Sequence, residues 1–227
     1  MNLLQIDTTS VAEGAAEATE KTLSVFDLAV TGGFIMIPLL ILSIITIYIF
    51  VERFMVLKKA SEEDPTFMAN IKDYISSANI ESAKSLCDNT DSSTARMLSK
   101  GISRIGKPLK DISQAIENVG KQEIFKLEKN LSTLATIAGA GPMIGFLGTV
   151  VGMIKTFFNM ANAGGNIDIP LLSGGIYQSM VTTVGGLIVG LIALIAYNIL
   201  VAKVEGVVHE LEGDTIEFMD LLNEPSK

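Results

Sequence analysis

Three long stretches without a charged residue constrain this chain more than any other feature. They cover 18 residues from Phe34 to Val51, 24 from Leu131 to Ile154 and 34 from Ile169 to Ala202. The hydrocarbon core of a bilayer is about 30 Å thick and needs roughly 20 apolar helical residues, so each stretch is long enough, or nearly so, to cross it. The sequence therefore predicts an all-α membrane protein with three transmembrane helices.

The rest of the composition weighs against several classes of protein. The chain has a formal net charge of −8, one cysteine (Cys87) and one histidine (His209). This argues against a disulfide scaffold and against a basic nucleic-acid binder. Neither residue has a partner at the spacing of a metal site or a catalytic motif. We therefore expect no enzyme, with no catalytic residue, metal or cofactor.

The distribution of positive charge predicts the orientation. Of the 17 Lys and Arg residues, 13 lie between Arg53 and Lys129. Positive residues near the ends of spans tend to stay in the cytoplasm, so the N-terminus is expected outside and the C-terminus inside. The acidic start lacks the basic region of a cleaved signal peptide, and none is expected. The expected division is an outer tail (1–33), transmembrane helices at 34–56, 131–157 and 173–202, a cytoplasmic segment (57–130), an outer loop (158–172) and a cytoplasmic tail (203–227).

Helical periodicity continues outside the spans. Apolar residues at spacings of three and four predict short amphipathic helices near residues 67–75, 80–87 and 95–105. From Pro108 the pattern has no strong stop, which predicts one helix of ~70 Å through the second span. The third helix is expected to end near Val208. The tail beyond it, with seven acids from Glu205 to Glu224, is expected to form a solvated collar, or else a charged inner vestibule.

Small residues in the second and third spans predict close helix packing. Pairs of glycines four residues apart allow helix backbones to approach where lipid offers little hydrophobic drive for association. The pairs are Gly141/Gly145, Gly148/Gly152 and Gly186/Gly190.

Polar side chains accompany these glycines. They are Thr149 in the second span and Gln178, Ser179, Thr182 and Thr183 in the third. A hydroxyl can simply bond to its own helix four residues earlier, and that alternative stays open for each Ser and Thr. The Gln178 amide would be costly facing lipid. Together these residues predict a polar interior surface. Since hydroxyls and amides do not titrate near neutral pH, any proton crossing here needs an acid from another chain.

Three segments carry a resemblance to a known family. They are Gly145–Phe157 (GFLGTVVGMIKTF), Gly175–Gly190 (GIYQSMVTTVGGLIVG) and Ile195–Asn198 (IAYN). They resemble the MotA/TolQ/ExbB proton channel family, and most closely its ExbB-like members, which have three spans where MotA has four.

The resemblance implies a pentamer in the bacterial inner membrane, with a periplasmic N-terminus and a central pore lined by the second and third spans. It implies a single-span ExbD- or TolR-like partner whose Asp carries protons, with the work delivered through a TonB-like protein. Thr149 and Thr183 match the family's polar Thr positions and would face that Asp. Gln178 stands where many members have Glu, so a ring of carboxylates from this subunit is in question. Lys155 is expected to be an interfacial residue or a gating residue.

Three other functions remain open. The first is a TolQ-like role in the Tol-Pal envelope system. The second is a scaffold that does not conduct protons and uses the glycines for assembly only. The third is a secondary transporter, but the chain has no paired repeat and no broken helices with converging charges.

Overall fold

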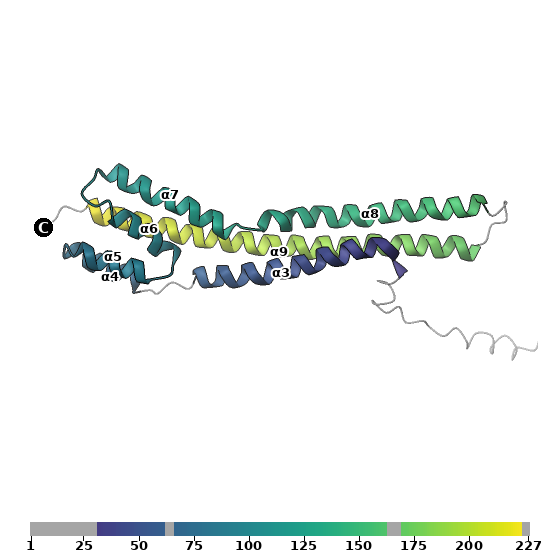
Figure 1. The fold of residues 1–227 in the computed structure, drawn as a ribbon, viewed down its shortest axis with the longest axis horizontal. Coiled ribbons are helices and arrows are strands. Elements are labelled where there is room, and N and C mark those ends of the chain that lie inside the picture. The colour runs from purple at the N-terminus through teal and green to yellow at the C-terminus, as the bar shows by residue number, and fades with distance from the viewer. Residues whose placement is uncertain (1–30, 62–65, 163–168, 224–227) are drawn as a thin grey trace, which may run out of the picture.

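The described part of the chain is helical and elongated. A computed structural model describes residues 31–61, 66–162 and 169–223. The elements are η1 (Gly33–Ile35), α3 (Met36–Ser61), α4 (Phe67–Ser76), α5 (Ile80–Asn89), α6 (Ser93–Ile102), α7 (Leu109–Leu127), α8 (Leu131–Asn162) and α9 (Ile169–Asn223). Figure 1 shows α3, α8 and α9 side by side over one half of the molecule, with the shorter helices around the rest of α9. The predicted all-α class is confirmed for these residues.

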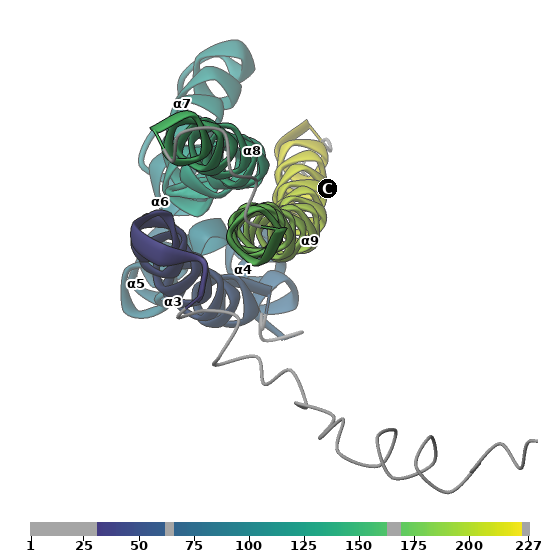
Figure 2. The ribbon, with the colours of Figure 1, turned by 90° about the vertical axis from the view of Figure 1, so that its right-hand side faces the viewer.

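Three segments are long and apolar enough to cross a membrane. They are Gly33–Ser61, Leu109–Asn162 and Leu172–Asn223. Their number agrees with the three predicted transmembrane helices, and Figure 2 shows the three helices end-on as separate columns. The predicted outer tail, apart from residues 31–33, and residues 163–168 of the predicted outer loop lie outside the described residues.

Helix α9 runs further than the sequence predicted. It is 55 residues long, about 80 Å at 1.5 Å per residue, and it continues past Val208 to Asn223. Its last part stays helical because Val207, Leu211 and Phe218 form one buried face, while most of the acids lie on exposed faces. The acidic segment is therefore a helix packed on one side, and only its outer side fits the expected solvated collar.

The expected single helix from Pro108 through the second span is wrong, because the chain breaks between α7 and α8. Asn130 has a φ of 66°, a left-handed conformation that asparagine tolerates better than most residues. The break is also held from outside the helix. Arg53 of α3, which is 5% exposed, donates a hydrogen bond of 3.1 Å to the carbonyl oxygen of Lys126.

The short amphipathic helices are confirmed as α4, α5 and α6. Two of them begin with the N-cap that their sequence provides. Asn79 accepts a hydrogen bond from the Ser82 amide at 3.2 Å, and Ser92 accepts one from the Ala95 amide at 3.0 Å. Such caps satisfy amide donors that have no partner inside the helix.

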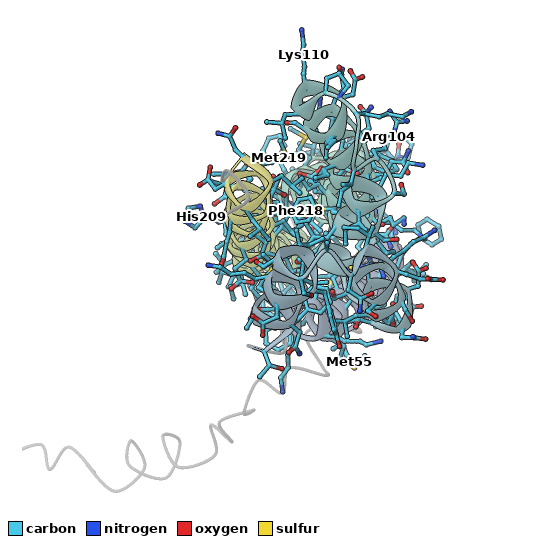
Figure 3. All side chains as sticks on the ribbon, turned by 90° about the vertical axis from the view of Figure 1, so that its left-hand side faces the viewer. Met55, Arg104, Lys110, His209, Phe218 and Met219 are labelled. Carbon is cyan, nitrogen blue, oxygen red and sulfur yellow. The ribbon has the colours of Figure 1, made fainter. Side chains whose placement is uncertain are left out.

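Helices α4 to α7 and the C-terminal part of α9 form what we call the short-helix body. Its core includes Ile71, Leu98, Ile116 and Phe218, each of which is almost fully buried. Figure 3 looks onto this end of the molecule, where His209 and Lys110 project outward. Cys87 also lies in the core, and burial raises the pKa of its thiol to about 12.

A chain of ion pairs crosses the short-helix body. It links Lys59 to Asp91 (2.9 Å), Asp91 to Arg96 (3.0 Å), Arg96 to Glu123 (2.7 Å) and Glu123 to Lys126 (2.7 Å). The Glu123 side chain is 4% exposed. Burial raises the pKa of Glu123, but the hydrogen bonds and positive charges of Arg96 and Lys126 lower it further, so its pKa lies below the usual value.

Helices α8 and α9 touch through backbone at a glycine seam, formed by Gly141 and Gly145 on α8 and Gly186 and Gly190 on α9. A Cβ atom at Gly186 would lie 2.6 Å from the Gly141 oxygen and 2.7 Å from the Gly145 Cα. Backbone atoms cannot rotate away as a side chain does. The glycines therefore permit a contact that any larger residue would block, as the predicted packing requires.

We expect Gly186→Ala to separate the two helices and to lower stability by about 1–3 kcal/mol, the usual cost of overpacking. The measurement is thermal unfolding in detergent, followed by circular dichroism. Gly139→Ala is the matched control, since a Cβ there meets no atom within 4 Å. Equal midpoints for the two variants would mean that the seam tolerates a methyl group.

A second prediction concerns acid stability. Because folding lowers the pKa of Glu123, the stabilisation it provides is complete above the unfolded-state pKa and is lost as the pH falls through the folded-state pKa. Between about pH 5.5 and about pH 3.5, the melting temperature of the wild type should therefore fall more than that of Glu123→Gln. Glu117→Gln, which removes only an exposed pair with Lys121, should follow the wild type. Parallel curves for the wild type and Glu123→Gln would contradict this prediction.

Candidate functional site

Two threonine hydroxyls meet where α8 and α9 touch. Thr149 lies one turn after Gly145, and its hydroxyl is hydrogen-bonded to that of Thr183. The Thr149 Oγ1 also lies 3.2 Å from the Ser179 carbonyl oxygen, and the Thr183 Oγ1 lies 3.2 Å from the Gly145 carbonyl oxygen. Both side chains are half-buried. We call Thr149 and Thr183 the hydroxyl pair.

The Thr149 hydroxyl lies closer to an acceptor on the opposite helix than to the acceptor on its own helix. The Gly145 oxygen, in the same helix as Thr149, is 3.5 Å from the Thr149 hydroxyl and thus further away than the oxygen on α9. Ser179 behaves differently, since it donates to the Gly175 oxygen of its own helix at 2.7 Å. Thr182 likewise donates to the Ser179 oxygen at 2.7 Å. The alternative left open for every hydroxyl therefore applies to Ser179 and Thr182, but it does not account for the hydroxyl pair.

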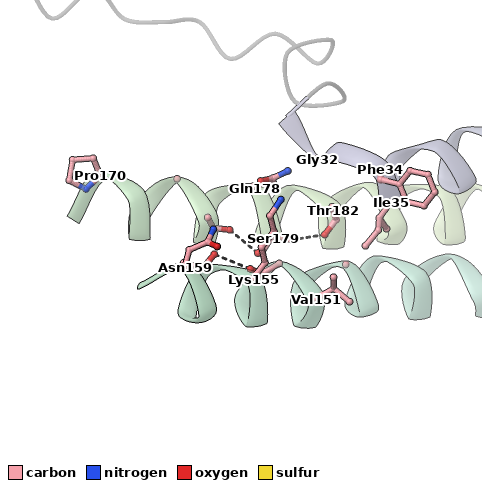
Figure 4. Close-up of a pocket in the computed structure, with 15 residues that line it drawn as sticks. Gly32, Phe34, Ile35, Val151, Lys155, Asn159, Pro170, Gln178, Ser179 and Thr182 are labelled. Carbon is pink, nitrogen blue, oxygen red and sulfur yellow. Dashed lines mark hydrogen bonds between the residues drawn. The ribbon is translucent and has the colours of Figure 1, made fainter. Parts of the chain in front are cut away.

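The other predicted polar residues line a separate cavity of about 550 Å³ at the end of α8 and α9 nearest their connection. We call it the end pocket. Gln178, Ser179 and Thr182 line it from α9, and Gly32, Phe34 and Ile35 line it from η1 and the residue before it. Figure 4 shows Gln178, Ser179 and Thr182 on one helix, with Lys155 and Asn159 on the helix beside it. The hydroxyl pair is not part of this lining, although Ser179, whose carbonyl oxygen lies 3.2 Å from the Thr149 hydroxyl, does line it.

Two polar residues of the end pocket were missed from the sequence. Thr156 and Asn159 both line it from α8. Thr156 is 7% exposed and donates to the Gly152 oxygen at 2.9 Å. Its position seven residues after Thr149, on the same helix face, was the available signal. Gly148 and Gly152, predicted as packing residues, lie beneath Thr182 and Ser179 respectively and also line the pocket.

The uncharged part of this helix pair has little capacity for acid-base chemistry of its own. The stretches 131–154 and 169–202 contain no Asp, Glu, His, Lys or Arg. Hydroxyl and amide groups can hold water and pass on a hydrogen bond, but they neither take nor release a proton near neutral pH. Among the residues that the structure describes, no group of three or more His, Cys, Asp or Glu side chains could hold a metal ion.

The outer faces of α8 and α9 are apolar and uncovered in the single chain. Met143 is 74% exposed and Phe146 is 65% exposed, and further exposed apolar side chains follow along both helices. Extended exposed apolar surfaces mark contacts with lipid or with other chains. The hydroxyl pair and the end pocket are therefore polar features of a helix pair whose outer faces are largely apolar in the stretches 131–154 and 169–202.

Comparison with known proteins identifies the family of this architecture. The model of the MotA/TolQ/ExbB proton channel family matches residues 89–213, more than half of the 227-residue chain. The putative biopolymer transport protein ExbB-like 1 of Synechocystis is 26% identical over 191 residues, covering 80% of this chain and 72% of the relative. These matches confirm the resemblance carried by the membrane motifs.

Shorter matches reach both branches of the family. The putative biopolymer transport protein ExbB-like 2 of Helicobacter pylori is 39% identical over 79 residues, covering 35% of this chain and 52% of the relative. The Tol-Pal system protein TolQ of Haemophilus influenzae is 29% identical over 115 residues, covering 51% of this chain and 50% of the relative. With three helices able to span a membrane and a family match over more than half its length, this multi-pass membrane protein belongs to the MotA/TolQ/ExbB proton channel family.

Proposed function

We propose that this chain is the channel subunit of an ExbB-type stator, in which five copies surround a pore and hold the single helices of an ExbD- or TolR-like partner. The observation that carries the proposal is the hydroxyl pair. It joins the two helices at a backbone contact, and the stretches 131–154 and 169–202 around it contain no Asp, Glu, His, Lys or Arg. Such a surface can guide a proton carrier but cannot be one.

The partner must supply the acid. A carboxyl group is the simplest side chain that exchanges protons across a membrane near neutral pH, and this chain has none between residues 131 and 154 or between 169 and 202. Each hydroxyl of the pair keeps an oxygen lone pair after its own proton is donated. Water or a protonated partner Asp can donate to those lone pairs. In this proposal Thr149 and Thr183 orient the partner acid, and protonation of that acid changes its contact with them.

Gln178 has a different role in the proposal. Gln178 lines the end pocket, whose lining includes neither Thr149 nor Thr183, so the proposal gives it no direct contact with the partner acid. Replacing a family Glu by an amide at this position would change the charge beside the pocket and leave the hydroxyl pair intact. Proton transfer here would then need no ring of carboxylates from this subunit.

The distribution of Lys and Arg supports an inner-membrane protein with a periplasmic N-terminus and the short-helix body in the cytoplasm. Work would then be delivered through a TonB-like protein to energised import at the outer membrane. A TolQ-like role in the Tol-Pal envelope system is the second candidate, favoured by the match to the Haemophilus influenzae TolQ protein. The two roles differ in the partner protein that receives the work, so affinity purification with each partner type separates them.

The central test replaces each hydroxyl by a methyl group of nearly the same size. We expect Thr149→Val and Thr183→Val each to reduce proton flux by at least about tenfold, equivalent to about 1.4 kcal/mol in the barrier. The pentamer should stay intact, because valine fills the same space. The measurement is dye-detected proton flux into liposomes that contain the chain and its partner, with oligomeric state followed by size-exclusion chromatography.

Thr136→Val is the matched control. Its exposed hydroxyl bonds only to the Ser132 oxygen of its own helix, at 2.8 Å, and flux should stay at the wild-type level. Normal flux in both Thr149→Val and Thr183→Val would refute the role of the hydroxyl pair. Tight assembly with the partner but no flux even in the wild type would favour the scaffold function instead.

A further inference from the structure

The end pocket has the features of a built site that the proton path does not use. Its volume of about 550 Å³ lies within the range of small-molecule sites. Its lining comes from η1 with the residue before it and from facing turns of α8 and α9, so three separate segments contribute to it. Neither residue of the hydroxyl pair contributes to it.

The charge that lines the end pocket is positive. Lys155 is the single charged residue among the described residues that line it, and Lys155 forms no ion pair within the described part of the chain. It directly follows the uncharged stretch that ends at Ile154. A lysine at that point lies where an apolar span meets the lipid headgroups. The pocket therefore offers a cation to an anionic group at headgroup level.

Two side-chain amides supply the reachable polar groups of the pocket. Gln178 and Asn159 both line it and are exposed. Ser179 and Thr182 are 1% and 2% exposed and pack against Gly152 and Gly148, so their hydroxyls are covered. An amide offers both a donor and an acceptor. Gln178 and Asn159 therefore favour a ligand that carries hydroxyl groups. From Lys155 to Gly148 the lining extends over seven residues, about 10 Å along the helix.

The rim of the pocket is apolar and exposed. Phe34 is 83% exposed, and Ile35, Val151 and Pro170 complete this side of the lining. An acyl chain can lie against such side chains, whereas a free ion gains nothing from them. The combination of one cation, two exposed amides and an apolar rim fits an amphiphile with an anionic head that bears hydroxyl groups.

We propose that the end pocket binds an anionic phospholipid with a hydroxyl-bearing headgroup, of the phosphatidylglycerol type. The phosphate pairs with Lys155, the headgroup hydroxyls bond to Gln178 and Asn159, and the acyl chains lie along Phe34 and Ile35. The bound lipid ties η1 to the α8–α9 pair. This binding is independent of proton transport.

The test is thermal unfolding of the full-length chain in mixed micelles that contain phosphatidylglycerol or phosphatidylcholine. Phosphatidylglycerol should raise the melting temperature of the wild type by about 3 °C or more relative to phosphatidylcholine. Lys155→Gln should lose this shift. Lys110→Gln removes the same charge from an exposed position at the start of α7, in the short-helix body. This variant should keep the shift. An equal loss in both variants would mean diffuse attraction to the many basic residues and would overturn the site.

Two further additions identify the ligand. Soluble glycerol phosphate at the same concentration should give no shift, and a shift as large as that with the lipid would overturn the lipid assignment. Phosphatidic acid, which lacks headgroup hydroxyls, should give a smaller shift than phosphatidylglycerol, and an equal shift would overturn the role of Gln178 and Asn159. If Lys155 instead pairs with a carboxylate of the chain itself, such as Asp168, then Lys155→Gln should lower the melting temperature by the same amount in both lipids. That result would also overturn the proposal.

Discussion

The backbone contact between α8 and α9 determines most of what this chain can do in a membrane. Lipid provides little hydrophobic drive for two helices to associate, so they must gain close packing and hydrogen bonds instead. Glycines at positions 141, 145, 186 and 190 bring the backbones together, and this approach brings Thr149 within hydrogen-bonding distance of Thr183. A wider separation would leave each hydroxyl to bond within its own helix. The polar site is therefore a consequence of the packing.

The same contact divides the polar side chains between two positions. The hydroxyl pair occupies the seam itself, while Gln178, Ser179 and Thr182 border the end pocket together with Lys155. In the proposed function, the first group meets the partner acid. In the proposed lipid site, Gln178 and Lys155 meet a headgroup. The hydroxyl pair thus serves a moving partner without any ionisable group from this chain, whereas the end pocket binds an amphiphile through the charge of Lys155.

Helix α9 connects the membrane part with the short-helix body because it belongs to both. Its first part packs on α8, and its last part contributes Leu211 and Phe218 to the core. Helix α3 ties the two regions a second time. Arg53 bonds to the last turn of α7, and the Lys203 Nζ lies 4.7 Å from the centre of the Phe54 ring. Two helices, α3 and α9, therefore connect the membrane part with the short-helix body.

The sequence by itself determined the class of fold, the three spans and the family, because these depend on properties that add up along the chain. Runs without charge, the spacing of glycines and the motifs around Thr149 and Thr183 are readable without any contact. Only the tertiary structure decided that α7 ends before the second span, because the stop comes from Asn130 and from an arginine that lies 73 residues before the carbonyl it binds. Only the structure separated the hydroxyl pair from the end pocket and carried α9 on to Asn223. Periodicity along one helix gives the face on which a residue lies, but the neighbour that meets that face is fixed by packing between segments that are distant in the sequence.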